Sequence, residues 1–329
     1  MKTIRIAGTG SYLPEKVLSN YDLEKMVDTS DEWIRQRTGI SERRVARPDQ
    51  TASDLAEEAA LLALEQAEMA PEDLDLLIMA TITPDTCCPS GANWLEKKIG
   101  AHGALSFDLT AACCGFLFGL SVAEHYLKVG TFANAMVVAA EVMSRTVNWQ
   151  DRSSSILWGD GSGVVILDTR RGDGAEIIST IVHTDASRGD NLLMPGGGSK
   201  TTPISHESVD QGIHYLQLIE APTTFRVAVE HFTKACEEAL EVNGLTPDEI
   251  ALYIPHQANI RIMQAMAKKL KVSMDRIFVN IDRYGNISSA SMAIALDEAN
   301  RQGRINRGDL VLLCGFGGGL TWGSSLIRW

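Results

Sequence analysis

The segment from Ala104 to Phe116 carries two adjacent cysteines, Cys113 and Cys114, just before a glycine. Residues 105–109 have the pattern of a short apolar strand, and residues 115–127 that of a helix that is apolar almost all round and therefore buried. At the start of a helix the backbone N–H groups are unpaired and the helix dipole is positive. Both effects favour thiolate, the nucleophilic form of cysteine. The pair is a candidate nucleophile, and the alternative is two ordinary buried thiols.

Two polar residues follow similar segments in the second half of the chain. His256 directly follows a predicted apolar strand, and Asn286 precedes a predicted helix at residues 288–301. The carboxyl ends of sheet strands are the places where sites form in α/β proteins. We therefore expect Cys113, His256 and Asn286 to meet, although a lone histidine is more often a surface or structural residue.

These segments belong to an internal repeat. Pro71-Glu-Asp stands between a predicted amphipathic helix and an apolar strand, and Pro247-Asp-Glu stands between a second such pair. The turns that carry Cys113 and Asn286 match in the same way. A repeat of this length predicts two similar α/β halves, each with a mostly parallel sheet that has helices on both faces.

The length of 329 residues is enough for two domains, and the repeat divides the chain into the halves 1–172 and 173–329. The net charge of −12 argues against binding to nucleic acid or to an anionic membrane surface. The cysteines form no CxxC pair, so we expect no metal site. The sequence has no apolar signal segment and no run long enough to span a bilayer, which predicts a cytoplasmic location.

Two glycine-rich segments need separate interpretations. Gly159-Asp-Gly-Ser-Gly163 leads into an apolar strand and not into a helix, which argues against a nucleotide-binding loop. Residues 184–223 are rich in Gly, Ser, Pro and polar residues. Loops of this length in compact domains are usually functional lids or disordered segments.

Four motifs together resemble the β-ketoacyl-acyl-carrier-protein synthase III family, the initiating condensing enzymes of type II fatty-acid synthesis. The resemblance runs from the first strand to the last residue. It implies an α/β, thiolase-type fold of five layers, αβαβα, and a homodimer. It also implies a primer acyl-CoA and malonyl-acyl-carrier protein as substrates, CO₂ and CoA as products, and no metal or redox cofactor. The motifs are Ala111-Ala-Cys113-x-Gly-Phe, Pro255-His256-Gln-Ala-Asn259, Tyr284-Gly-Asn286-x-Ser-Ser-Ala-Ser and Gly315-Phe-Gly-Gly318-Gly-Leu-Thr-Trp-Gly.

The family pattern assigns roles to the candidate residues. It makes Cys113 the nucleophile that a thioester acylates, and leaves Cys114 structural. The N–H groups of Cys113 and Gly318 resemble the family's oxyanion hole. Decarboxylation of a malonyl thioester produces an enolate, to which His256 Nε2 and the Asn286 amide can both donate without being charged.

A coenzyme A site can be carried over position by position. Trp33 and Arg37 resemble the pair that holds the adenine ring, with Arg152 on its other side, and stacking of a flat base between an indole and a guanidinium is physically apt. The alternative for Trp33 by itself is a core or surface tryptophan. The remaining carried-over positions are Asn259, which resembles the residue that bonds the pantetheine arm, and Phe225 and Ala228, which resemble its apolar wall.

Positive charges gather on one predicted helix face. Arg261, Lys268 and Lys269 are spaced i, i+7 and i+8 in a chain that is acidic overall. Such a stripe is usually a solvated face, but this one begins near His256 and carrier proteins are acidic. We therefore expect it to contact the carrier protein.

The segment Thr83–Ser90 resembles the loop that crosses the dimer interface and closes the partner's acyl pocket. In family members that are restricted to short primers, the position of Cys88 is often phenylalanine. Cysteine is much smaller, so we expect an open pocket that accepts longer or branched primers. The alternative is that another side chain fills the space.

Other functions remain open at this point. A related acyltransferase that does not decarboxylate, or a condensing enzyme of a secondary-metabolite pathway, would share most motifs, although the presence of both His256 and Asn286 argues against the first. A biosynthetic thiolase would use Cys314 as a second catalytic cysteine. A non-catalytic carrier-protein scaffold with a relict site is the alternative from another class.

Overall fold

The computed structural model describes residues 2–199, 204–219 and 221–329. Nine strands form one continuous sheet, and two pairs of short strands, β2 with β3 and β9 with β10, lie apart from it. The strands are β1 (Arg5–Tyr12), β2 (Val17–Ser19), β3 (Glu42–Arg44), β4 (Leu76–Ala80), β5 (Leu105–Leu109), β6 (Asn134–Val142), β7 (Asp160–Asp168), β8 (Ala175–Thr184), β9 (Leu192–Leu193), β10 (Gln217–Leu218), β11 (Leu252–Pro255), β12 (Leu310–Gly317) and β13 (Thr321–Arg328).

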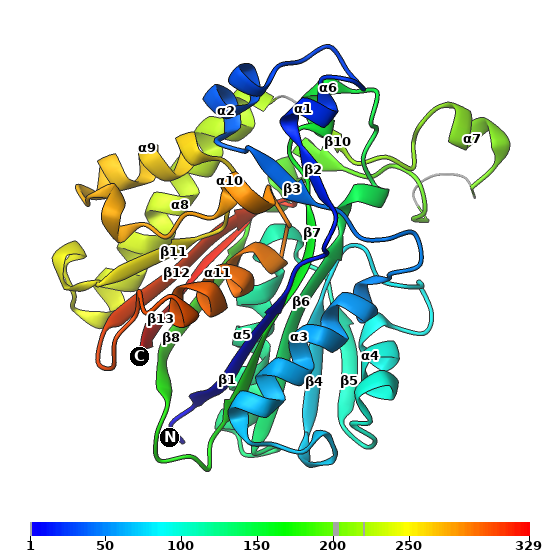
Figure 1. The fold of residues 1–329 in the computed structure, drawn as a ribbon. Helices are drawn as coiled ribbons and strands as arrows, with labels where there is room; N and C mark the ends of the chain where they lie inside the picture. The colour runs from blue at the N-terminus through cyan, green and yellow to red at the C-terminus, as the bar shows by residue number, and fades with distance from the viewer. Residues whose placement is uncertain (1, 200–203, 220) are drawn as a thin grey trace.

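The helices form three layers around the two parts of the sheet (Figure 1). Helices α3 and α4 cover one outer face, α8 and α9 cover the other, and α5 and α11 lie between the two parts and contact both. This arrangement confirms the predicted five-layered αβαβα fold. The helices are α1 (Asn20–Leu23), α2 (Asp31–Thr38), α3 (Ala52–Ala67), α4 (Gly91–Ile99), α5 (Gly115–Lys128), α6 (Arg152–Ser155), α7 (His206–Asp210), α8 (Ala221–Asn243), α9 (Ile260–Leu270), α10 (Ile281–Tyr284) and α11 (Ala290–Arg301).

The strand order shows the internal repeat directly. The sheet runs β11-β12-β13-β8-β1-β7-β6-β4-β5, so β4, β6, β7 and β1 have the same order as β11, β12, β13 and β8. In both parts the first two strands are parallel and the next two pairings are antiparallel. The segment at Val279, expected to repeat β5, is not a strand, and only an isolated bridge between Tyr253 and Ile277 stands in its place.

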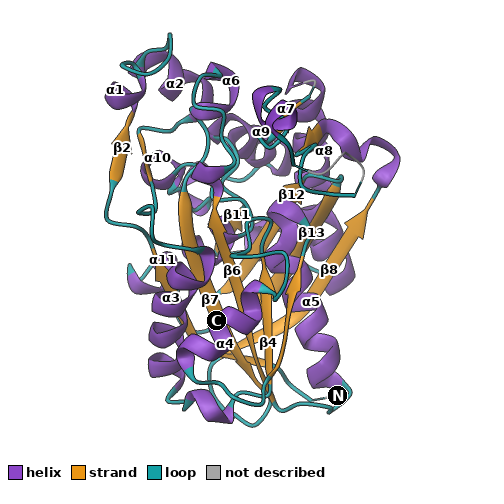
Figure 2. Ribbon diagram, turned by 90° about the vertical axis from the view of Figure 1, so that its right-hand side faces the viewer, coloured by secondary structure: helices purple, strands orange, loops and turns teal. Residues whose placement is uncertain are grey.

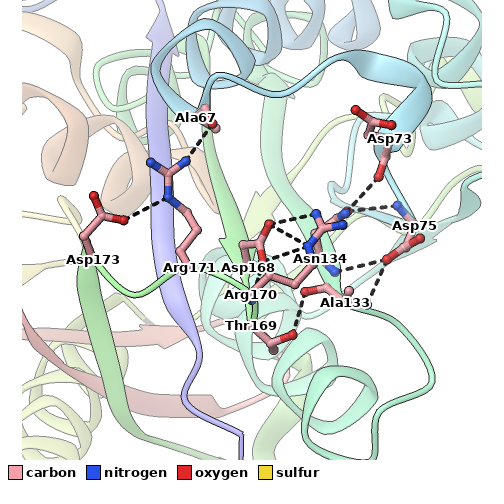
Figure 3. A network of polar contacts seen from close by, with 10 residues as sticks. All are labelled: Ala67, Asp73, Asp75, Ala133, Asn134, Asp168, Thr169, Arg170, Arg171 and Asp173. Carbon is pink, nitrogen blue, oxygen red and sulfur yellow. Dashed lines mark hydrogen bonds and ion pairs between the residues drawn. The ribbon is translucent and has the colours of Figure 1, made fainter.

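The two parts of the sheet join through a short pairing of β1 with β8, in which Arg5 lies opposite Glu176 and Ile6 opposite Ala175. The proposed boundary after residue 172 falls in the turn between β7 and β8. A polar network surrounds this turn (Figure 3). In it, Arg170 pairs with Asp168 at 2.8 Å and the Arg171 guanidinium donates to the carbonyl of Ala67 at 2.7 Å.

The same network fixes the starts of two parallel strands. Asn134, the first residue of β6, donates to the carbonyl of Asp73 at 2.8 Å and accepts from the N–H of Asp75 at 2.9 Å (Figure 3). Because β4 and β6 begin here, their carboxyl ends lie at the other end of the sheet. Helices α2, α6 and α9 gather at that end, opposite the N-terminus (Figure 1, Figure 2).

Small residues let the central helices approach the sheets closely. A Cβ on Gly119 of α5 would lie 2.8 Å from a methyl of Val137, and one on Gly163 would lie 2.6 Å from the Cβ of Ala293 in α11. Gly161 and Gly163 of the glycine cluster therefore belong to β7 and let α11 pack closely on it, as the strand context indicates. None of the helices formed by the described residues combines the length and apolar composition that a membrane crossing requires.

The long segment at residues 184–223 contains short elements and is not wholly irregular. A 3-10 helix at Ala186–Asn191, the β9–β10 pair and α7 lie within it. Residues 200–203 and 220 of the predicted lid lie outside the described residues. Leu192 and Leu218, which belong to the strand pair, line the cavity described below.

Candidate active site

Cys113 lies in a tight turn between β5 and α5. The turn is a 3-10 helix at Ala112–Cys114, and α5 begins at the next residue, as the sequence predicts. Ala112 has φ +46°, a left-handed conformation that costs free energy for a residue with a Cβ and that often occurs at functional sites. The strained turn holds the Cys113 side chain at the start of a buried helix, where it is 5% exposed.

A glycine-rich turn from the second half approaches Cys113. A Cβ on Gly317 would lie 2.9 Å from the backbone nitrogen of Cys113, so only glycine fits there. The backbone N–H groups of Gly318 and of Cys113 itself both interact with the Cys113 thiol and lower its pKa. The two expected oxyanion-hole donors therefore lie beside the same sulfur atom.

The charge state of Cys113 differs from the expectation at the start of a helix. Burial is the main cause that raises the pKa of its thiol to about 12. The Ser288 hydroxyl and the two backbone N–H groups oppose this shift but do not cancel it. Burial therefore outweighs the effects at the helix start that favour thiolate, and it holds Cys113 as a protonated thiol at neutral pH, because packing from both halves removes the sulfur from water.

Cys114 points away from the cavity. Its Sγ donates to the carbonyl oxygen of Thr321 at 3.4 Å, the residue is fully buried, and burial raises its pKa above the usual range. Cys314 is also fully buried and its Sγ lies 3.8 Å from the sulfur of Met266. Neither residue lines the cavity that contains Cys113, so the structure gives no second catalytic cysteine of the thiolase kind at this site.

Asn286 lies in the corresponding turn of the second half. Its backbone N–H donates to the carbonyl of Leu157 at 2.8 Å, and its side-chain Oδ1 accepts from the N–H of Ser288 at 2.8 Å. Ser288 has φ +48°, which repeats the left-handed conformation of Ala112 in the first half. With Oδ1 committed to the backbone, the amide NH₂ of Asn286 is the group free to serve a ligand.

His256 follows β11 directly, and its backbone N–H donates to the carbonyl of Cys314 on β12 at 2.8 Å. The side chain is 1% exposed, and neither ring nitrogen has a hydrogen-bond partner. Burial lowers the pKa of His256 to about 3, so the imidazole is neutral near pH 7. Unpartnered buried polar atoms are rare, and here they line a cavity where a substrate can satisfy them.

One cavity of about 550 Å³ joins these groups. Cys113, His256 and Asn286 all line it, and Gly318 lies beside them. The volume falls in the range typical of small-molecule sites. The predicted ligand-contacting residues that also line it are Arg37, Phe225, Ala228, Asn259 and Arg261.

Trp33 and Arg152 do not line this cavity but lie next to Arg37, which does. The guanidinium of Arg152 lies 5.1 Å from the centre of the Trp33 ring and that of Arg37 lies 5.5 Å from it. The predicted trio is therefore assembled, with Arg152 stacked on the indole itself. An adenine ring bound between Trp33 and Arg152 requires Arg152 to move off the indole.

Asn259 joins α2 to α9. Its Oδ1 accepts from the N–H of Arg261 at the start of α9, and its Nδ2 donates to the carbonyl of Arg37 at 3.0 Å. One amide hydrogen and one lone pair remain for a ligand. The Arg261 guanidinium lies 5.6 Å from the ring of Phe225, so this residue borders the cavity and the exposed surface at once.

The other two predicted surface features lie outside the cavity. Lys268 and Lys269 are exposed near the end of α9. Cys88 is also exposed and does not line the cavity of its own chain. Its predicted place in a partner's acyl pocket stays a prediction.

Sequence reasoning missed Glu141, which is fully buried beside the site. The signal for it was a single acid at the end of the apolar run that forms β6. The sequence motif contains Ser288 and Ser289 but assigns them no role. In the structure both are buried, Ser288 next to Cys113 and Ser289 next to Glu141.

Comparisons with known proteins place the chain in a family. Residues 107–186 match 3-oxoacyl-[acyl-carrier-protein (ACP)] synthase III, and residues 240–329 match its C-terminal part. A β-ketoacyl-[acyl-carrier-protein] synthase III from Caldanaerobacter subterraneus is 49% identical over 98% of this chain and 97% of its own length.

Two solved structures are similar along their whole length. The 3-oxoacyl-[acyl-carrier-protein] synthase III from Aquifex aeolicus VF5 is 43% identical, with a TM-score of 0.90 over 99% of this chain and 100% of its own. The priming β-ketosynthase from the R1128 polyketide biosynthetic pathway is 34% identical, with a TM-score of 0.89 over 99% and 96% of the two chains. The chain therefore belongs to the β-ketoacyl-acyl-carrier-protein synthase III family of condensing acyltransferases.

Proposed function

We propose that this enzyme condenses a primer acyl-CoA with malonyl-acyl-carrier protein to give 3-oxoacyl-acyl-carrier protein, CO₂ and CoA. One observation carries the proposal: a single cavity joins a thiol flanked by two backbone N–H groups to a neutral imidazole and an amide NH₂ without protein partners. A nucleophile and two separate sets of hydrogen-bond donors are what a two-step acyl transfer with an enolate intermediate requires.

In the first step the Cys113 sulfur attacks the acyl-CoA carbonyl and a tetrahedral oxyanion forms. The N–H groups of Cys113 and Gly318, which lie beside the sulfur, donate to this oxyanion. Collapse breaks the bond to the CoA sulfur and leaves the acyl group on Cys113. Since the resting group is a thiol, its proton ends on the CoA sulfur.

In the second step malonyl-acyl-carrier protein loses CO₂, and the electron pair of the broken bond forms an enolate. The thioester oxygen of the enolate accepts from His256 Nε2, which has no protein partner, and from the amide NH₂ of Asn286, whose Oδ1 is bonded to Ser288. The enolate carbon then attacks the acyl group on Cys113, and the Cys113 sulfur leaves and takes up a proton from the solvent. None of these steps needs a metal or a redox cofactor.

The primer enters past Trp33, Arg37 and Arg152, and its pantetheine arm runs along Asn259, Phe225 and Ala228 toward Cys113. The order of these residues supports the proposal, since Arg37 lines the cavity together with Asn259, Phe225 and Ala228 and also contacts the Trp33 ring, on which Arg152 stacks. Arg261, Lys268 and Lys269 supply positive charge for an acidic carrier protein at the mouth of the cavity and on the α9 surface next to it.

We also propose a homodimer in the cytoplasm. β5 is the last strand at one end of the sheet, so its outer edge has no neighbouring strand among the described residues, and Leu105 on it is 43% exposed. Unpaired apolar edges associate with other chains unless they are covered. Pairing of two copies here would bring the Cys88 loop toward the partner. Sedimentation of the unmodified protein and of Leu105→Lys tests this interface.

The deciding experiment follows the two half-reactions separately. The enzyme is incubated with radiolabelled acyl-CoA, and the label is located by peptide mapping; malonyl-acyl-carrier protein is then added and CO₂ release is measured. We expect the label on Cys113, no label in Cys113→Ala, and a 3-oxoacyl product only when both substrates are present. Label on Cys114, or product formation by Cys113→Ala, would contradict the proposal.

A second candidate shares this chemistry. The 34% identity to a priming ketosynthase of a polyketide pathway favours a condensing enzyme that serves a secondary-metabolite carrier protein. Comparing condensation rates with fatty-acid and polyketide carrier proteins distinguishes the two. We expect the fatty-acid carrier protein to be preferred.

A further inference from the structure

Glu141 is a buried acid that the reaction steps above do not use. It is the second-last residue of β6 and has no exposed surface. Its Oε2 accepts from the hydroxyls of Thr83 at 2.7 Å and Thr81 at 3.2 Å and from the N–H of Ile82 at 3.1 Å. Its Oε1 lies 2.8 Å from the hydroxyl of Ser289. The side chain thus bridges β6, the segment that follows β4 and the turn before α11.

The Ser289 hydroxyl faces two acceptors, and this arrangement bears on where the proton of the bridge lies. The Ser289 hydroxyl is 2.8 Å from Glu141 Oε1 and 3.1 Å from the carbonyl oxygen of Ala80. A hydroxyl has one hydrogen, and a carbonyl oxygen can only accept. If Ser289 donates to Ala80, the contact with Oε1 needs a hydrogen from the carboxyl group.

The hydroxyls on the other oxygen are consistent with this assignment. Thr81 Oγ1 accepts from the N–H of Thr83 at 3.0 Å, and Thr83 Oγ1 accepts from the N–H of Val142 at 2.8 Å. The hydrogens of both hydroxyls are therefore free to point at Oε2 of Glu141. A carboxylic acid with its proton on Oε1 satisfies every one of these groups, whereas a carboxylate leaves Ser289 with two acceptors for one hydrogen.

We propose that Glu141 is a neutral carboxylic acid that donates its Oε1 proton to Ser289 and thereby positions the Asn286–Ser289 turn against the ends of β4 and β6. Glu141 touches no substrate in this role and acts through the turn. The turn carries Asn286, whose Oδ1 accepts from Ser288, and the Cβ of Ser289 would lie 3.2 Å from a Cβ on Gly115 at the start of α5. The bridge thus sets the enolate donor relative to α5, the helix that begins just after Cys113.

The electrostatics of the site agree with a neutral group. Burial raises the pKa of Glu141, against the opposing effect of its hydrogen-bond donors. The titratable group that faces it is Cys113, and a negative charge on Glu141 would raise the pKa of the Cys113 thiol. The neighbours from β4, its following segment and the α11 turn are hydroxyl and backbone groups. A neutral acid supports the turn without opposing the negative charge that develops at Cys113 and on the enolate.

Substitutions of Glu141 test the protonation state through catalysis, a readout that rests on the proposed function. Glu141→Gln keeps an NH₂ that donates to Ser289 and an oxygen that accepts the three other donors, so we expect it to retain most of the CO₂-release rate. Glu141→Ala removes the bridge, and a misplaced donor costs on the order of 10²-fold in kcat. The KM for malonyl-acyl-carrier protein should change little. Equal losses in both variants would show that the function requires an ionised carboxylate and would overturn the proposal.

A second measurement does not depend on catalysis. The infrared difference spectrum between the unmodified enzyme and Glu141→Gln should contain the carbonyl stretch of a protonated carboxylic acid, shifted in Ser289→Ala. Glu124→Gln is the matched control, because Glu124 is also buried but is ion-paired with Lys128 at 2.6 Å. The Glu124→Gln replacement should remove the bands of an ionised carboxylate from the spectrum instead. Carboxylate bands lost in Glu141→Gln would overturn the proposal even if the enzyme condenses as proposed, and an inactive protein would leave this readout intact.

Discussion

The side-chain oxygen of Asn286 accepts a hydrogen bond of 2.8 Å from the backbone N–H of Ser288. This bond fixes which end of the amide faces the backbone, so the NH₂ group is the one available in the cavity. The amide is therefore a hydrogen-bond donor toward the cavity. Exchanging its oxygen and NH₂ group would break the hydrogen bond that holds the turn. The assignment of donor and acceptor at such an amide comes from its network of partners.

Replacement of Asn286 should separate the two half-reactions. Asn286→Ala removes one enolate donor, and loss of such a donor costs about 10²–10³ in rate. Asn286→Asp keeps the acceptor for Ser288 but places a carboxylate where the enolate forms, so we expect a loss at least as large. Both variants should still be acylated at normal rates, as measured by label transfer from acyl-CoA. Normal CO₂ release by either variant would remove Asn286 from the enolate site.

The thiol of Cys113 should react faster as the pH rises. Burial raises its pKa to about 12, so the thiolate fraction grows about tenfold per pH unit throughout the neutral and mildly alkaline range. We expect the rate of alkylation of Cys113 by iodoacetamide, followed by peptide mapping, to rise about tenfold for each pH unit between about pH 7 and pH 9. A rate that levels off below pH 8 would mean that the resting site stabilises the thiolate after all.

Decarboxylation should be insensitive to pH in the range where histidine normally titrates. The pKa of His256 is lowered to about 3, so the ring stays neutral from about pH 6 to pH 8 and keeps its donor. We expect Cys113→Ala, which cannot be acylated, to release CO₂ from malonyl-acyl-carrier protein at a constant rate over this range. His256→Ala should release it about 10²–10³ times more slowly. A step in the rate near pH 6.5 would show that His256 titrates in the working site.

Much of this site follows from local sequence. The strand Leu105–Leu109 and the start of the helix at Gly115 are where their patterns predict them, because turn and helix signals are local. The repeat predicted that the Cys113 and Asn286 turns would meet, and both line one cavity. The family resemblance supplied Gly318, whose position depends on a long-range approach.

The errors and omissions have one physical cause. The helix start favours a thiolate at Cys113, but the burial that Gly317 and the Ser288 turn complete from more than 170 residues away outweighs this effect. Glu141 was missed because its neighbours along the chain are apolar, and only the folded structure brings it to Ser289. Charge states of buried groups depend on tertiary contacts, which a local pattern does not contain.

Charge reversal on α9 should separate the carrier-protein step from the CoA step. Lys268 and Lys269 are exposed and outside the cavity, so the double variant with Glu at both positions should raise the KM for malonyl-acyl-carrier protein only. Arg261 lines the cavity and stacks on Phe225, so Arg261→Glu should impair both steps. The carrier-protein effect should shrink at high salt, which screens surface charges.

The control for these charge reversals is Arg307→Glu. Arg307 is exposed before β12, away from the carboxyl ends of the parallel strands where the cavity lies, and its reversal should leave both steps unchanged. If it raises the KM for the carrier protein as much as the lysine reversals do, the effect is one of net charge. A change in that KM confined to the α9 variants supports a local contact.

Primer size should depend on Cys88. In the dimer that we propose, the loop that carries this small residue reaches the partner's acyl pocket, where a phenylalanine at this position would limit the space. Each buried methylene contributes about 0.8 kcal/mol when it has room. A longer or branched primer should therefore compete well with acetyl-CoA, and Cys88→Phe should suppress isobutyryl- and hexanoyl-CoA while sparing acetyl-CoA.

The measurement is a competition among these three primers, with Cys87→Phe as the control. Cys87 is the exposed neighbour of Cys88 in the same loop, so its replacement adds the same bulk one position away. The control therefore tests whether added bulk in this loop is enough by itself to change the choice of primer. Strict acetyl preference in the unmodified enzyme would show that another side chain fills the space. Equal effects of both replacements would show that a bulky residue disturbs the loop in general, and that Cys88 does not line the acyl pocket.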